Sequence, residues 1–306
     1  MENGDLNKLI MNQDPEKILN FYTHFNDQNE LIKWMKHRPK GRADIYEIEG
    51  PKDIIVVIPT ESHSTKGAIN CRESVFRGFH LIFVESGPND PYFNYASNCN
   101  TGIEVALSYN PKWIVLSNDD MVRIDDPSVL RNNLETLDEH KVSAVFTECS
   151  SYHSYPVFLG YPNKIRQLYF MISNKENRMQ LKLERKFGIK VVVQNYGSLQ
   201  RNFFKGYTTV INIGAFGIFS SDYIRSLGNK LFDDVYLNEF EELEASYILR
   251  DANLPTATIK YRIGDLIGTG LGRSTVRKYR AIASRSYFNY KISEGKLNFR
   301  VDAKHA

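Results

Sequence analysis

The sequence has few cysteines, little net charge and no long apolar run. Its three cysteines show no C-x-x-C spacing, which argues against a disulfide framework or a zinc site and fits a reducing compartment. The 39 lysines and arginines barely exceed the 36 aspartates and glutamates, so the charge gives no reason to expect a nucleic-acid-binding protein. We find neither a run of roughly 18 apolar residues nor a signal-peptide pattern. We therefore expect a cytoplasmic protein that contacts membranes at most peripherally.

Two common nucleotide-binding motifs are also missing. The chain has no G-x-x-x-x-G-K-[ST], and no G-x-G-x-x-G follows a predicted strand, which disfavours a P-loop NTPase and an ordinary NAD enzyme. What remains is a globular composition, with 306 residues of which 42% are hydrophobic and 25% are charged. Such a chain is long enough for one large α/β domain or two ordinary ones.

The first 50 residues predict helices. Asp14 is typical of an N-cap, and Pro15 suits the first helical position because its missing N–H costs nothing there. Apolar residues then recur at helical spacing in residues 18–25, and a further helical segment is predicted around residues 31–35. We expect an N-terminal helical extension over residues 1–50.

From residue 51 onward, strands and helices alternate. Apolar, β-branched runs predict strands that are buried on both faces. These predicted strands are residues 53–60, 80–86, 112–120 and 142–148. Apolar residues at helical spacing lie between them, and one predicted helix starts at Pro127 and runs to about residue 140. Alternation of this kind predicts an α/β, Rossmann-like fold, with a mostly parallel sheet and helices on both faces. Later, residues 208–221 are strand-like and residues 237–253 predict a helix that ends at Asn253.

Residues 164–190 are basic and partly amphipathic. One interpretation is an amphipathic helix that packs on the sheet. The other is a peripheral membrane face that reaches a lipid-linked acceptor. We favour the first interpretation.

Polar and acidic residues follow three of the predicted strands. Ligands of open parallel sheets bind beyond the carboxyl ends of the strands, so these residues are candidates for a ligand-binding site. They are Thr60, Glu61 and Ser62 after the first strand, Glu85, Ser86 and Gly87 after the second, and Asn118, Asp119 and Asp120 after the third. Two adjacent carboxylates repel each other unless a cation offsets them, and Mg²⁺ or Mn²⁺ prefers oxygen ligands. A solvated Asx turn is the alternative for Asn118–Asp120. For His63, nearby, the alternatives are a phosphate contact and a solvent-exposed loop, and we favour the loop.

An acidic cluster opens the predicted helix near residue 240. Acidic residues in a first turn stabilise a helix dipole, but four glutamates, Glu239, Glu241, Glu242 and Glu244, exceed what a cap requires. A carboxylate held near a substrate hydroxyl can act as a general base. The cluster is therefore a candidate catalytic site.

The order of these motifs resembles that of the family 2 glycosyltransferases, which have the GT-A fold. The resemblance covers roughly residues 52–290. Residues 54–62 (IIVVIPTES) resemble the opening strand and nucleotide loop, residues 83–90 (FVESGPND) the second-strand motif, and residues 100–106 (NTGIEVA) the Asn-x-Gly helix start. Residues 113–122 (WIVLSNDDMV) are similar to the metal motif, with Asn118 and Asp120 at the outer positions of the D-x-D pattern, and residues 212–253 resemble the acceptor half.

This resemblance implies a role for each candidate residue. Thr60, Glu61 and Glu85 would hold the base and ribose of a nucleotide, Asn118 and Asp119 would contact the ribose and sugar, and Asp120 would bind Mn²⁺ or Mg²⁺. Glu242 would be the catalytic base, with Glu241 beside it. The implied reaction moves a sugar with inversion from a UDP-, GDP- or dTDP-sugar to a hydroxyl of a glycan, lipid-linked or protein acceptor.

The chain departs from the family pattern at two places. The family often has a metal-binding His after the last core strand, but residues 261–270 contain none, and Asp265 is the nearest residue that can bind a metal. An Asp can replace a His for a hard cation. The acidic pair is Glu-Glu, and Ile248 stands where an Arg often follows.

We divide the chain into the extension at residues 1–50, a nucleotide-sugar-binding half at 51–150, an acceptor-binding and catalytic half at 151–290, and a tail at 291–306. Two alternative functions stay open. One is a sugar-phosphate nucleotidyltransferase, although residues 58–67 lack the Gly-rich phosphate loop expected of that class. The other is a non-catalytic nucleotide-binding protein on the same fold.

Overall fold

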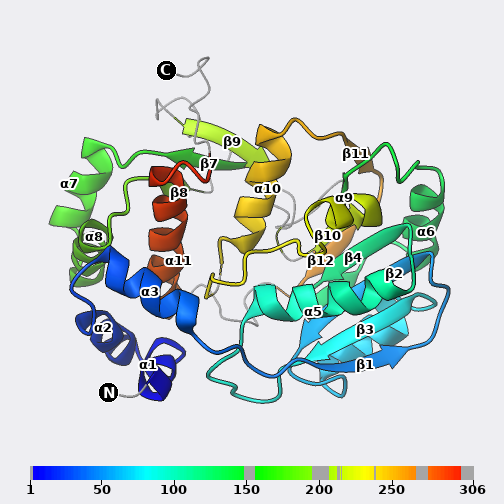
Figure 1. Ribbon diagram of the computed structural model, residues 1–306, viewed down its shortest axis with the longest axis horizontal. Helices are drawn as coiled ribbons and strands as arrows, with labels where there is room; N and C mark the ends of the chain where they lie inside the picture. Colours follow the sequence, from blue (N-terminus) through cyan, green and yellow to red (C-terminus); the bar gives the residue numbers. More distant parts are fainter. Residues whose placement is uncertain are drawn as a thin grey trace.

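The computed structural model describes residues 3–147, 156–194, 207–211, 214, 216–237, 239–266 and 275–297. The chain forms an α/β fold with a seven-stranded sheet toward one end and a group of helices toward the other (Figure 1). The central sheet has the order β1-β3-β2-β4-β10-β6-β11. Its strands are β1 (Asp44–Ile48), β2 (Ile54–Thr60), β3 (His80–Glu85), β4 (Trp113–Ser117), β6 (Ala144–Thr147), β10 (Phe216–Ser220) and β11 (Thr256–Ile259).

The central sheet is mixed but mostly parallel. β3, β2 and β4 run parallel, and β6 pairs in parallel with β11. β1 pairs antiparallel with β3, and β10 pairs antiparallel with both β4 and β6. Every residue of β2 is buried, as its continuous apolar sequence predicts.

Helices cover both faces of this sheet, which confirms the coarse prediction. Along β2, Val56 and Ile58 pack toward one face, whereas Ile55 and Val57 pack toward the other. The first face is covered by α4 (Lys66–Asn70), the π-helical turn η1 (Cys71–Val75) and α6 (Pro127–Glu135). The second is covered by α5 (Tyr95–Ser108), α9 (Ser221–Ser226) and α10 (Glu241–Asp251).

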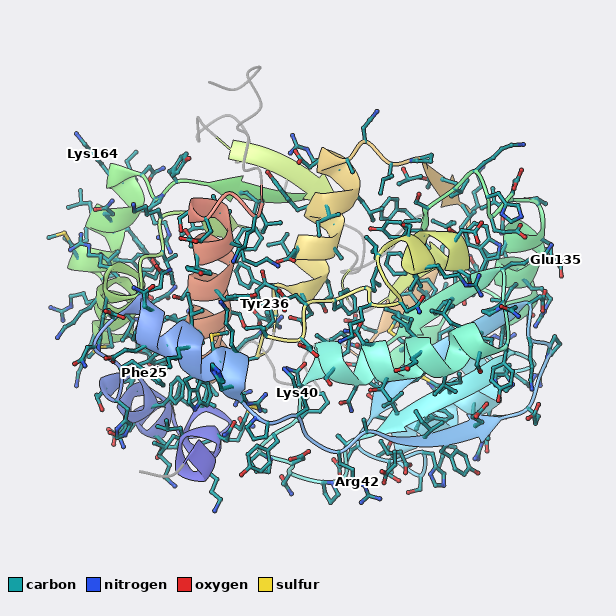
Figure 2. The ribbon with its side chains drawn as sticks, viewed as in Figure 1. Phe25, Lys40, Arg42, Glu135, Lys164 and Tyr236 are labelled. Carbon is teal, nitrogen blue, oxygen red and sulfur yellow. The ribbon has the colours of Figure 1, made fainter. Side chains whose placement is uncertain are left out.

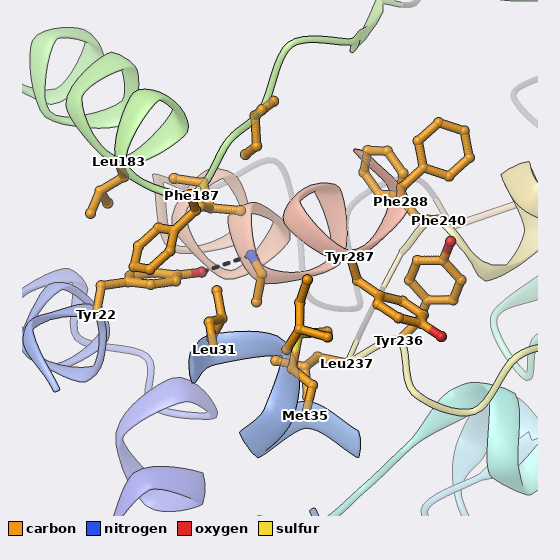
Figure 3. Close-up of a cluster of buried hydrophobic side chains, with 14 of the residues drawn as sticks. Tyr22, Leu31, Met35, Leu183, Phe187, Tyr236, Leu237, Phe240, Tyr287 and Phe288 are labelled. Carbon is orange, nitrogen blue, oxygen red and sulfur yellow. Dashed lines mark hydrogen bonds between the residues drawn. The ribbon is translucent and has the colours of Figure 1, made fainter. Parts of the chain in front are cut away.

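The N-terminal and C-terminal helices share a separate apolar core (Figure 3). It joins α1 (Asn3–Ile10), α2 (Pro15–Thr23) and α3 (Gln28–His37) to α8 (Lys175–Lys186) and α11 (Thr275–Ser293). Asp14 caps α2 as predicted, because its side chain accepts a hydrogen bond from the Glu16 amide. The Tyr22 hydroxyl accepts a bond of 3.0 Å from the Ala283 amide, drawn dashed in Figure 3.

Two small sheets complete the described structure. One contains β7 (Pro156–Gly160), β8 (Val192–Gln194) and β9 (Tyr207–Ile211). The other pairs β5 (Met121–Arg123) with β12 (Ile263–Asp265). The strand-like residues 208–221 thus contribute to two different sheets through β9 and β10.

Several local predictions need correction. The helix that starts at Pro127 ends at Glu135 and not near residue 140, because residues 136–141 form turns in which Asp138 accepts the His140 amide. β1 lies inside residues 1–50 and was not predicted, since two of its five side chains, Asp44 and Glu47, are charged. Residues 164–190 contain two helices, α7 (Lys164–Ile172) and α8. α7 packs on α8 and exposes its apolar side chains, so the prediction that this segment packs on the sheet is wrong.

Candidate functional site

The carboxyl ends of β2 and β4 place Thr60 beside Asp119. Thr60 Oγ1 donates a hydrogen bond of 2.6 Å to Asp119 Oδ2. On the other side, Gly67 of α4 packs so closely that a Cβ there would lie 2.4 Å from the Asp119 carbonyl oxygen. The Asn118–Asp120 segment is therefore held by a side-chain bond and by close backbone packing.

The end of β3 adds Glu85 to the same edge. Glu85 Oε1 accepts a bond of 2.5 Å from the His63 amide and lies 2.6 Å from His63 Nδ1. The His63 ring in turn stacks on Tyr46 of β1, with 3.7 Å between ring centroids and an interplanar angle of 7°. Partial burial would raise the pKa of Glu85, but the bonds from His63 outweigh it and hold this pKa below its ordinary value.

His63 thus corrects one expectation and reveals a group that the sequence did not indicate. It is half-buried between Glu85 and Tyr46 and does not lie in an open loop.

Glu61 is exposed, and its carbonyl accepts the Gly87 amide at 3.0 Å. The Thr60 carbonyl accepts the Ser86 amide at 2.9 Å. These backbone bonds join the ends of β2 and β3.

Asp120 directly precedes β5, and Asp265 ends β12. Asp265 pairs with Met121, and the Leu266 amide donates a bond of 2.9 Å to the Asp120 carbonyl. The backbones of the two residues predicted as metal ligands therefore lie one residue out of register on paired segments, although the residues are far apart in the sequence. Two carboxylates are a donor set that fits Mg²⁺ or Mn²⁺, which commonly binds to one or two carboxylates and to substrate phosphates. Within the described ranges, no cluster of three potential metal ligands occurs.

Glu241 and Glu242 begin α10 directly after a left-handed turn. Glu239 and Phe240 have φ angles of 67° and 79°, a conformation that non-glycine residues adopt only when their surroundings impose it. Two contacts with α11 hold the turn: Glu239 bonds to Arg277, and the Phe240 ring packs against Phe288 at 5.5 Å. Figure 3 shows Phe240 and Phe288 in contact at the end of the helical core.

After this turn the Glu241 side chain is buried and that of Glu242 is half-buried. Burial, with a smaller contribution from the Glu239 carboxylate, raises the pKa of Glu242 to about 7, although a backbone hydrogen bond and the Arg277 charge oppose the shift. Burial together with the Glu242 charge raises the pKa of Glu241 well above its ordinary range. In the described part of the chain, Glu241 Oε2 is buried without a hydrogen-bond partner. A carboxyl whose pKa is near 7 can exchange a proton at neutral pH.

α5 connects the two halves of the site. Asn100 accepts the Leu231 and Phe232 amides at 3.1 and 3.2 Å and donates to the Phe232 carbonyl at 2.8 Å. Asn94 donates to the Asp234 and Tyr236 carbonyls. Two residues later than Asn100, Gly102 lets α5 pack closely on β2 and β3, because a Cβ there would lie 2.3 Å from Val57 Cγ1. The Asn-x-Gly sequence thus fixes the segment that leads to α10.

The structure therefore groups the sequence-predicted residues into three sets. Thr60, Glu85, Asn118 and Asp119 lie at the ends of β2, β3 and β4. Asp120 directly precedes β5, and Asp265 ends β12. Glu241 and Glu242 begin α10. Tyr46 and Arg277 were not predicted as site residues, and for His63 a solvent-exposed loop was favoured over a phosphate contact. Arg277 stands in a generally basic segment, where nothing local distinguishes it from its neighbours.

Comparisons with known proteins do not identify a family. No protein-family profile matches the chain, and no curated protein matches it. Of the helices described, none is long and apolar enough to cross a membrane.

Proposed function

We propose that the protein is a metal-dependent, inverting glycosyltransferase of the GT-A fold that uses a nucleotide-sugar donor. The observation that carries this proposal is the pairing of β5 with β12, which brings the backbone of Asp265 within one residue of register with that of Asp120. The family 2 glycosyltransferases, which the chain resembles, often have a further metal-binding residue after the last core strand. We assign that role to Asp265.

The ends of β2, β3 and β4 suit a nucleotide donor. The Glu85 carboxylate can accept an N–H of a base, because each carboxylate oxygen has more than one acceptor site. The hydrogen bond from Thr60 holds the Asp119 carboxylate in one orientation. A residue that positions ribose or sugar needs such a fixed orientation. Glu61 and Asn118 complete this set in our proposal.

Asp120 and Asp265 would hold Mn²⁺ or Mg²⁺. When bound, such a cation offsets the negative charge that grows on a leaving diphosphate. The chain supplies the two carboxylates on a backbone ladder whose hydrogen bonds limit their relative movement. Asp120 directly follows Asp119, which is itself bonded to Thr60.

Glu242 would be the general base, and Glu241 would lie beside it. An ionised Glu242 takes the proton of an acceptor hydroxyl, and the hydroxyl oxygen forms a bond to the anomeric carbon while the bond from that carbon to the diphosphate breaks. The nucleoside diphosphate leaves as an anion, and the configuration inverts because attack and departure occur on opposite faces. A pKa of about 7 leaves a large part of Glu242 ionised at neutral pH.

Calorimetric titration tests the donor site. UDP, GDP and dTDP are titrated with and without Mn²⁺ into the wild type, Asp120→Ala and the control variant Asp251→Ala, whose residue is exposed at the far end of α10. We expect one nucleotide to bind in a Mn²⁺-dependent manner to the wild type and the control but not to Asp120→Ala. The absence of binding by all three nucleotides would contradict the proposal.

The Glu242→Gln variant separates the proposal from its alternatives. An enzyme should lose turnover and keep nucleotide affinity, because glutamine preserves shape but cannot take a proton at neutral pH. Nucleotide binding without any sugar transfer by the wild type would favour a non-catalytic binding protein. Formation of a nucleotide-sugar from a sugar phosphate and a nucleoside triphosphate would favour a nucleotidyltransferase.

A further inference from the structure

Helix α7 has its apolar side chains on the solvent side. The exposed fractions are 76% for Ile165, 56% for Leu168, 58% for Tyr169, 57% for Met171 and 75% for Ile172. At 100° per residue these positions fall on one face of the helix. Tyr161, just before the helix, is also 58% exposed. Large exposed apolar patches of this kind mark interaction surfaces.

The opposite, polar face of α7 is directed into the protein. Arg166 makes two bonds of 3.1 Å to the buried Glu184 of α8, and Arg285 of α11 adds a third at 2.9 Å. Gln167 accepts a bond of 3.2 Å from Arg185. The Arg166 guanidinium also lies over the Phe170 ring at 4.5 Å. These contacts fix the rotation of α7, so that its apolar face cannot turn inward without breaking a buried ion-pair network.

The surface around this face is strongly basic. Residues 161–190 contain eight lysines and arginines and two glutamates, a local charge of +6 in a chain whose total is +3. Of the two glutamates, Glu184 is buried between Arg166 and Arg285, so Glu176 is the exposed one. On α8 a single exposed stripe carries four cations: Lys175, Arg178, Lys182 and Arg185.

We propose that this face, formed by α7 and the basic stripe of α8, binds the surface of a bilayer that contains anionic lipid. The apolar side chains of α7 enter the boundary between headgroups and acyl chains, and the stripe of α8 contacts the lipid phosphates. The combination favours a bilayer over an apolar protein partner, because α7 and α8 together carry exposed cations beside the apolar side chains: Lys164, Lys175, Arg178, Lys182 and Arg185.

The position of this face in the molecule fits such an attachment. Figure 1 shows α7 and α8 at one end of the long axis and α6 at the other. In Figure 2, Lys164 marks the outer end of α7, and Glu135 marks the opposite end of the protein. A protein attached through α7 therefore leaves the sheet and its ligand edge away from the lipid. The proposal does not depend on sugar transfer.

Vesicle flotation tests it. The full chain is mixed with vesicles of phosphatidylcholine alone, or of phosphatidylcholine with phosphatidylglycerol, at low and high salt. We expect binding to the anionic vesicles that weakens at high salt. Leu168→Glu with Ile172→Glu should lower the partition coefficient more than about tenfold, because two apolar side chains no longer enter the bilayer. Lys175→Glu with Lys182→Glu should lower it as well.

The matched control is Ile124→Glu, which places a carboxylate on an exposed isoleucine near α6. Binding unaffected by the α7 variant, lost equally in the control, or equal on both kinds of vesicle would overturn the proposal. Sedimentation velocity tests whether a second copy of the chain, and not a bilayer, covers the apolar face of α7. A dimer that becomes monomeric in Leu168→Glu with Ile172→Glu, without vesicle binding by the wild type, would also overturn it.

Discussion

Thr60 and Asp119 bond to each other across the carboxyl ends of two parallel strands. The Thr60 hydroxyl donates to Asp119 Oδ2 at 2.6 Å, and both side chains are partly screened from solvent. Hydrogen bonds to charged groups are among the stronger ones in proteins. This bond therefore orients a carboxylate at the edge of the sheet where we propose that the donor binds.

Replacing Thr60 by valine tests that orientation. The change keeps the shape of the side chain and removes the hydroxyl, so Asp119 loses one partner and gains freedom to rotate. We expect nucleotide affinity, measured by calorimetry, to fall by about tenfold or more. Thr258→Val, at an exposed position of β11, is the control and should leave the affinity unchanged. An unchanged affinity in Thr60→Val would remove Asp119 from the proposed donor site.

The Glu242→Gln variant should lower kcat by about 10²- to 10⁴-fold, the contribution typical of a general base. In the wild type, kcat should rise with pH and level off above about 7, because only the ionised carboxylate can take a proton and the pKa of Glu242 is about 7. The variant should lose this pH dependence. Glu104→Gln, on the exposed face of α5, is the matched control. A pH profile that is the same in wild type and Glu242→Gln would contradict the assignment.

The same raised pKa has a consequence for stability. Between its ordinary value and about pH 7, Glu242 keeps a proton in the folded protein that the unfolded chain releases. The folded state therefore binds more protons, and the free energy of unfolding should fall as the pH rises through this window. Urea unfolding at about pH 5 and about pH 8 should show a smaller fall in Glu242→Gln than in the wild type. Equal falls would contradict the raised pKa of Glu242.

Much of the fold could be predicted from local sequence, because the relevant forces act locally. Asp14 caps α2, Asn253 adopts a left-handed φ of 50° just beyond α10, and β2 is buried along its whole length. The direction of β10 could not be predicted, because a buried strand has the same apolar sequence pattern whether its neighbours run parallel or antiparallel to it.

The site was predictable in part for a similar reason. Residues that follow strands converge because parallel strands end at one edge, which is why Thr60 and Asp119 meet. The left-handed turn at Glu239 and Phe240 has no local signal, since neither residue favours that conformation; α11 imposes it through Arg277 and Phe288. Long-range contacts of this kind are not visible in a sequence pattern.

Glu184→Leu tests the network that orients α7. The substitution leaves the partly buried Arg166 and Arg285 without their shared, buried carboxylate, and loss of one partner of a buried ion pair costs about 3–5 kcal/mol. Both arginines hold the pKa of Glu184 below its ordinary value despite burial, so the wild type should lose this stabilisation as the pH falls below about 4.5. Chemical unfolding measures both effects. Glu176→Leu, exposed on the same helix, should have little effect, and an equal loss in both variants would contradict the network.

Gly67→Ala tests the packing behind Asp119. The new Cβ would lie 2.4 Å from the Asp119 carbonyl oxygen and 3.2 Å from its carbonyl carbon, and backbone atoms of a hydrogen-bonded segment cannot move aside as a flexible side chain can. We expect a loss of about 1–3 kcal/mol of stability together with weaker nucleotide binding, because Asp119 must shift. Gly102→Ala provides the comparison, since its Cβ would meet the Val57 and Val84 side chains inside the core. That variant should lose stability and keep its nucleotide affinity, so a similar loss of affinity in both variants would show that general destabilisation, and not the position of Asp119, determines binding.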